Sequence, residues 1–86
     1  MVDPNEIEAQ CTEIIRLLKL EREHQGLAML TVAQRAGLSQ QMVSYVERGI
    51  RRPTLDTVLR IAAALEIDFA EVIGKSVRTI TKRSGK

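Results

Sequence analysis

The sequence predicts an all-α protein built as one small domain, on three observations. Apolar residues recur at helical spacings along most of the 86 residues. Glycines follow these stretches at Gly26, Gly37, Gly49 and Gly74, where each can end a helix. A hydrophobic content of 44% is enough for a modest core without a metal or a disulfide. We therefore expect a compact bundle of five helices.

The first predicted helix starts close to the N-terminus. Asp3 is a suitable N-cap, and Pro4 is favoured at a first helical position. Ile7, Cys11 and Ile14 keep helical spacing and form one apolar stripe. A lone thiol in such a stripe is typical of a buried packing residue, so we interpret Cys11 as part of the core rather than as a nucleophile.

Residues 29–49 predict two short helices joined by a tight turn. Gly37 can adopt the left-handed conformation that ends the first of them, and Ser39 can cap the second. Val43 and Val46 lie three residues apart and can face inward together. This is the spacing of a helix-turn-helix, whose second helix can enter the major groove of DNA. A generic helical hairpin has the same spacing, so periodicity alone leaves both interpretations open.

Two further helices are expected after the loop 50–54. The first covers about residues 55–65, with Thr54 as its cap, and the second follows Asp68 and ends at Gly74. The apolar face expected to make the 55–65 helix the central packing helix consists of Leu55, Val58, Leu59, Ile61, Ala62 and Leu65.

The C-terminal residues look different from the rest. We divide the chain into a domain at 1–74 and a basic tail at 75–86, which lacks an apolar helical stripe and is expected to be frayed or disordered. A second interpretation stays open, because Val77, Thr79 and Thr81 alternate with the residues between them. That alternation would permit a β-strand added between protomers.

Charge is distributed unevenly although the net charge is only +2. The first 13 residues contain acids and no Lys or Arg, whereas residues 75–86 contain bases and no acid. A basic cluster also follows the second helix of the motif, as expected where a protein contacts phosphates. It consists of Arg48, Arg51 and Arg52.

Other functional classes find little support. The single cysteine and the single histidine, His24, provide neither a disulfide nor a cluster of metal ligands. We find no pairing of a nucleophile with a base and no phosphate-binding loop, so we expect neither an enzyme nor a cofactor. The acidic N-terminus is unlike a signal peptide, and no apolar run has membrane-spanning length. These features predict a cytoplasmic protein.

The residues themselves then distinguish the helix-turn-helix from a generic hairpin. The distinguishing motifs are Val32-Ala33, Ala36-Gly37, Leu38-Ser39 and Val46-Glu47-Arg48-Gly49, followed by Arg51-Arg52-Pro53-Thr54-Leu55. In these motifs the chain resembles the Cro and phage-repressor class of helix-turn-helix proteins, often called Xre-like. The resemblance spans about residues 14–73 in one order with matching spacings. It implies the λ-repressor-like bundle of five helices, which usually binds operator DNA as a two-fold dimer.

By this resemblance, residues 39–48 form the recognition helix. Gln40 and Gln41 stand where the family places polar groups that contact bases, and a glutamine amide matches the N6 and N7 edge of adenine. Ser44 and Tyr45 follow one turn later, also as candidates for base contact. A partly buried core aromatic is the other interpretation of Tyr45. We favour the groove, because the two valines already provide the inward stripe.

Phosphate contacts are expected around the motif. Arg48, Arg51 and Arg52 would position the protein on DNA without reading sequence, and Ser39 would contact the backbone as well. Many relatives begin the first motif helix with a Ser or Thr cap, but here Ala28 and Met29 stand instead. Any contact by Met29 must therefore use backbone N–H groups.

The resemblance also implies one structural contact. Glu47 is expected to pair with Arg22 and lock the first helix to the recognition helix. The residues of the last helix leave two interpretations open. Phe69 is expected to fill the core, and a short apolar last helix can instead cover a dimer partner, which makes Phe69, Val72 and Ile73 the candidate interface.

We therefore expect a sequence-specific DNA-binding transcriptional regulator that binds a palindromic operator as a homodimer. A repressor of the prophage or restriction-modification controller type is favoured, and activation through a contact with RNA polymerase stays open. The alternative is an antitoxin-like interaction module whose DNA binding is secondary.

Overall fold

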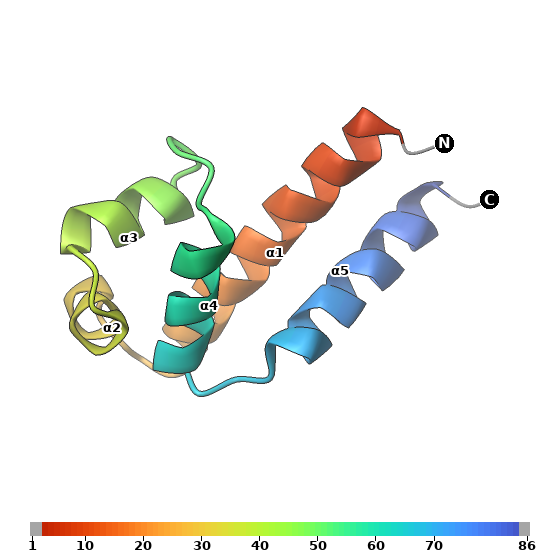
Figure 1. Ribbon diagram of the computed structural model, residues 1–86. Helices are drawn as coiled ribbons and strands as arrows, with labels where there is room; N and C mark the ends of the chain where they lie inside the picture. Colours follow the sequence, from red (N-terminus) through yellow and green to blue (C-terminus); the bar gives the residue numbers. More distant parts are fainter. Residues whose placement is uncertain (1–2, 85–86) are drawn as a thin grey trace.

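Five helices and no strand make up the part of the chain that the computed structural model describes, residues 3–84 (Figure 1). The helices are α1 (Pro4–His24), α2 (Met29–Ala36), α3 (Gln40–Glu47), α4 (Leu55–Ala64) and α5 (Phe69–Ser84). The predicted all-α class and the number of helices are confirmed. None of these helices is both long and apolar enough to cross a lipid bilayer.

The core lies where α2, α3 and α4 pack together and meet α1. Its largest fully buried apolar side chains are Leu65, Val32, Val43 and Val46, each at most 1% exposed. Leu18 brings α1 to this cluster, and Val58 and Ile61 bring α4. Small residues at Ala33, Ala36 and Ala62 let the short helices approach one another closely.

The helix α1 pairs with α5 as an antiparallel hairpin. Figure 1 shows the two helices side by side, extending away from the short helices, with the start of α1 and the end of α5 at the same end of the molecule. The protein is consequently elongated, with extents of 41 × 22 × 18 Å.

The fifth helix is longer than predicted, and its expected end at Gly74 is wrong. Gly74 does not have the positive φ of Gly37, and α5 continues to Ser84. Val72, Ser76 and Ile80 are all buried at 8% exposure or less, so residues beyond Gly74 pack inside the fold. Residues 75–84 are thus helical rather than frayed or extended as a strand. Whether they move separately from the domain stays a prediction, and the last two residues of the predicted tail lie outside the described chain.

The apolar face predicted for α4 is too wide. Leu55 is 68% exposed and Leu59 is 46% exposed, whereas Val58, Ile61 and Ala62 are buried. A single helix can bury only the stripe that faces its neighbours, so residues at the edge of a wide apolar face remain at the surface. These two leucines are therefore available for contacts outside the chain.

Candidate nucleic-acid interface

The turn between α2 and α3 has the geometry expected from the sequence. Gly37 has φ 72° and ψ 33°, the left-handed conformation that ends a helix. The backbone N–H of Leu38 donates to the carbonyl of Ala33 at 2.9 Å, which closes the end of α2. The hydroxyl of Ser39 accepts from the backbone N–H of Met42 at 3.0 Å and caps α3. The predicted caps at both sides of the turn are confirmed.

Two buried valines pack helix α3 against the core, and the first turn of the helix is exposed. Val43 and Val46 are 0% and 1% exposed, so the inner face is completely desolvated. Gln40 and Gln41 lie at the start of the helix and are exposed. A rigid helix that presents amide groups at its N-terminal end has the geometry used for contact with base edges.

Tyr45 is half-buried and takes part in a polar cluster at the surface rather than in the core. Its hydroxyl accepts a hydrogen bond from Nε2 of Gln41. The guanidinium of Arg51 lies 5.6 Å from the centre of the tyrosine ring, within the range of a cation–π contact. Ser44 is half-buried one position earlier, and its hydroxyl accepts from Nη1 of Arg48 at 3.3 Å. Gln41, Tyr45 and Arg51 thus form one connected group, and Ser44 and Arg48 form a separate pair beside it along α3.

The predicted basic residues differ in whether they already bind an acidic group. Arg48 and Arg51 are exposed and contact only neutral partners among the described contacts. Arg52 instead forms an ion pair with Glu8 of α1, and hydrogen bonding with this carboxylate raises the pKa of Arg52. The pair joins the loop after α3 to the N-terminal half of α1. Arg52 is therefore less available to an external anion than the other two arginines.

The ion pair predicted between Arg22 and Glu47 is present and nearly buried. Nε and Nη2 of Arg22 donate to the two carboxylate oxygens of Glu47 at 2.6 and 2.9 Å. The two side chains are only 13% and 10% exposed. Hydrogen bonding with Glu47 raises the pKa of Arg22, while burial acts in the opposite direction.

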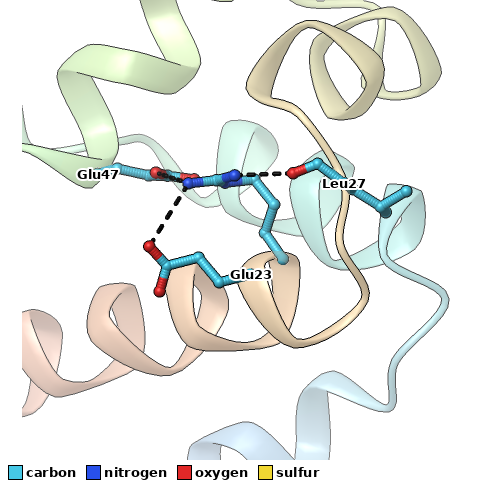
Figure 2. Close-up of polar contacts among 4 residues, drawn as sticks. Glu23, Leu27 and Glu47 are labelled. Atoms are coloured by element: carbon cyan, nitrogen blue, oxygen red, sulfur yellow. Dashed lines mark hydrogen bonds and ion pairs between the residues drawn. The ribbon is translucent and has the colours of Figure 1, made fainter.

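The same guanidinium also fixes the link into the motif. Its Nη1 donates to the carbonyl of Leu27 at 2.7 Å, and the carboxylate of Glu23 lies 3.9 Å from Nη2 (Figure 2). Arg22 therefore connects the end of α1, the link before α2 and the end of α3. This arrangement fixes the position of α3 relative to the body of the protein.

The entry into α2 has no side-chain cap, as the sequence predicted. Ala28 is the N-cap residue and makes no side-chain hydrogen bond. Met29 is half-buried at the first position of the helix. Because the first N–H groups of a helix have no partner within it, this end can offer backbone donors to a phosphate.

The residues predicted for a dimer interface lie on different sides of the α1–α5 hairpin. Phe69 and Ile73 line an apolar groove together with Cys11 and Leu55. Val72 is 8% exposed and lines the opposite side of the hairpin. The three residues therefore do not form one surface, because successive positions of a helix face different directions.

Sequence reasoning missed two buried polar residues, Glu13 of α1 and Ser76 of α5. Glu13 is 3% exposed and binds the guanidinium of Arg16 at 2.7 Å. Ser76 is completely buried, accepts from Nε2 of Gln10 at 3.2 Å and donates to the carbonyl of Ile73 at 2.7 Å. The spacing of Glu13 and Arg16 was a signal for the first contact. No local pattern signals the second, which joins residues far apart in the chain.

This geometry defines a helix-turn-helix with a seated, outward-facing second helix, and comparison with known proteins agrees. A helix-turn-helix family model matches residues 18–72, well over half of the chain. The chain belongs to this family, of the Cro and phage-repressor type, which consists of DNA-binding regulators rather than enzymes. The predicted family is thereby confirmed.

Related proteins are also described as regulators. An uncharacterized HTH-type transcriptional regulator of Mycobacterium tuberculosis is 39% identical over 56 residues, which are 65% of this chain and 39% of the relative. An uncharacterized HTH-type transcriptional regulator of Sinorhizobium fredii is 40% identical over 52 residues, covering 60% of this chain and 68% of the relative. The HTH-type transcriptional regulator SlrR of Bacillus subtilis is 27% identical over 71 residues, covering 81% and 47%. The chain thus spans about two fifths of the length of the mycobacterial relative.

Proposed function

We propose that this protein regulates transcription by binding a palindromic operator as a homodimer and inserting residues 39–48 into the major groove. The observation that carries the proposal is the state of α3: its inner valines are fully buried, its end is fixed by the pair of Arg22 and Glu47, and its outer face is free. Repression by occluding a promoter is the favoured outcome, since DNA binding alone is enough for it. Activation by a contact with RNA polymerase would need a further surface.

The base contacts are assigned to the exposed first turn and to the tyrosine one turn later. Gln40 has no hydrogen bond from its side chain among the described contacts and is free to pair with a base edge, best with adenine. Gln41 and Tyr45 are joined by their hydrogen bond and would reach the groove as a unit. Ser44 contributes a hydroxyl that Arg48 also holds.

The phosphate contacts are assigned to groups at the edge of this surface. Arg48 and Arg51 are exposed cations beside α3, and Ser39 and the backbone N–H groups at Met29 stand at the start of the two motif helices. Arg52 can join them only by exchanging Glu8 for a phosphate, so we expect it to contribute least. Such contacts add affinity without sequence preference and weaken as salt rises.

The dimer is assigned to the apolar groove beside α5 rather than to all three residues of the predicted interface. Ile73 is 38% exposed and half-buried Phe69 lines the same groove, which continues to the exposed Leu55. Val72 is excluded because it is buried within its own chain. A second copy on this groove would remove water from the exposed aliphatic groups, the main source of affinity in such contacts.

A gel-shift experiment with an operator obtained by DNA selection tests the proposal. The double substitution Gln40→Ala and Gln41→Ala is expected to lower the preference for the selected operator over random duplex by at least about tenfold, because each bidentate contact contributes roughly 1–3 kcal/mol. Gln34→Ala, which changes an exposed glutamine of α2, is the matched control and should retain the preference. An unchanged preference in the double variant would show that the base contacts are assigned to the wrong residues.

A further inference from the structure

The two sides of the α1–α5 hairpin differ in character. One side is the apolar groove described above. On the other side, two adjoining hollows share Leu17 and Lys75 and form a continuous channel between the helices. We call this channel the basic groove and define it by Arg16, Leu17, Leu20, Lys75, Arg78 and Lys82.

Four cations line the part of the basic groove that lies toward the C-terminus of α5, which we call its upper part. Lys75, Arg78 and Lys82 are exposed and follow one another at intervals of three and four residues, so they share one face of α5. At 1.5 Å per residue they extend over about 10 Å. Arg16 faces them from α1 with a side chain that is 56% exposed, although its guanidinium also binds the buried carboxylate of Glu13. The three cations of α5 form no ion pair among the described contacts.

The floor of the groove and its opposite, lower end, which lies near the start of α5, are not basic. Leu17 is half-buried and Leu20 is 51% exposed, so a strip of aliphatic surface runs beside the cations. Glu21 and Glu71 line the lower end, next to Lys75. The groove therefore has an apolar strip, a positive end and a negative end, and it favours a ligand with the complementary pattern.

A second copy of the chain is a poor occupant. A two-fold contact that aligns like ends would bring cations against cations, and one that aligns opposite ends would set only Glu21 and Glu71 of each copy against the four cations of the other, so positive charge stays in excess. Duplex DNA is also a poor match, because its uniformly charged backbone would continue past the cations to Glu21 and Glu71, which repel it, and gains nothing from contact with exposed Leu20. An amphipathic helix with aliphatic and acidic residues satisfies both the strip and the cations.

We propose that the basic groove binds an acidic amphipathic helix of a partner protein. The helix lies along the channel with its acidic residues toward Lys82 and its apolar edge on Leu17 and Leu20. This site is separate from the recognition helix α3, so the proposal does not depend on the proposed DNA-binding function. It gives the regulator a surface for a protein partner while α3 remains free.

Fluorescence anisotropy of the purified chain without DNA tests this assignment. The probe is a labelled peptide of about 18 residues, long enough for five helical turns, designed as an amphipathic helix of Leu and Ala with its glutamates confined to the half that meets the cations. We expect saturable, salt-sensitive binding in the micromolar range. Lys82→Glu should weaken it about tenfold by converting an attraction into a repulsion. Lys19→Glu changes the net charge equally on an exposed residue of α1 outside the groove, and it should change the affinity less than about twofold.

A second variant and a second ligand make the outcome decisive. Leu20→Ser should also weaken the peptide, because it removes aliphatic contact without changing charge. A duplex without the operator is titrated in parallel. The proposal is overturned if the peptide shows no saturable binding, if both charge variants act equally, or if Lys82→Glu affects only the duplex. The last result would assign the cations to the phosphate backbone.

Discussion

At the scale of single residues, the contact that most controls the position of α3 is the pair of Arg22 and Glu47. Replacing Glu47 by Leu would leave an arginine that is only 13% exposed without the carboxylate of its bidentate partner. Removing one partner of a buried pair typically costs about 3 kcal/mol, since the remaining charge loses its compensation. We expect the free energy of unfolding, measured by urea denaturation followed by circular dichroism, to fall by about that amount.

A double-mutant cycle separates the pair from the rest of the site. The variant that combines Arg22→Met with Glu47→Leu removes both charges and should recover much of the loss, because neither partner is then left uncompensated. Additive losses in the cycle would mean that the two residues act independently. Operator affinity depends on the position of α3, so it should recover less in the double variant than the free energy of unfolding does. The reason is that the two hydrophobic residues do not reproduce the bond from Arg22 to the carbonyl of Leu27.

Residue contacts of this kind were predictable only where the family motif includes them. The resemblance located Arg22 and Glu47, and hydrogen-bonding chemistry located Ser39 as a cap. The pair of Glu8 and Arg52 joins residues 44 positions apart and lies outside any motif. Its formation depends on the tertiary position of α1, which no local spacing encodes.

At the scale of elements, the sequence predicted where four helices lie but misjudged the fifth. Gly74 follows an apolar stretch, which is a normal signature of a helix end. The helix continues because Ser76 and Ile80 keep the inward spacing begun by Val72. This pattern is hard to recognise in the sequence, because a serine such as Ser76 is rarely counted as a core residue. Its hydroxyl can be buried because folding supplies its hydrogen-bond partners.

The conformation of Gly74 gives a prediction whose sign depends on the course of α5. Inside a helix, Gly74→Ala should raise the free energy of unfolding by about 0.5–1 kcal/mol, because alanine restricts the unfolded chain. The new Cβ would approach Nη1 of Arg78 to 3.3 Å, and this flexible group can move aside. Thermal unfolding followed by circular dichroism measures the shift. A loss of stability would indicate that the helix ends at this glycine.

Gly37→Ala is the matched comparison, and the opposite sign is expected. Gly37 has a φ of 72°, where an alanine is strained, and its Cβ would meet Nη1 of Arg60 at 3.2 Å. The cost should be about 1 kcal/mol. The pair of variants therefore distinguishes a glycine inside a helix from one that ends a helix.

At the scale of the whole molecule, the long α1–α5 hairpin separates two kinds of surface. The acidic start of α1 and the basic C-terminal part of α5 are brought to one end because the two helices run antiparallel (Figure 1). The apolar groove lies on one side of the hairpin and the basic groove on the other. The charge segregation was visible in the sequence, but the division into two sides was not, because it requires the rotation of α5 about its axis.

This division predicts which side forms the dimer. Ile73→Asp should weaken self-association at least about 100-fold, since a two-fold interface contains the changed residue twice and would bury both carboxylates. Sedimentation equilibrium over a range of protein concentrations measures the change. Leu20→Asp changes an aliphatic residue of similar exposure on the opposite side and should leave self-association intact. If Leu20→Asp separates the protomers and Ile73→Asp does not, the dimer uses the basic groove, and the assignments of both sides of the hairpin are reversed.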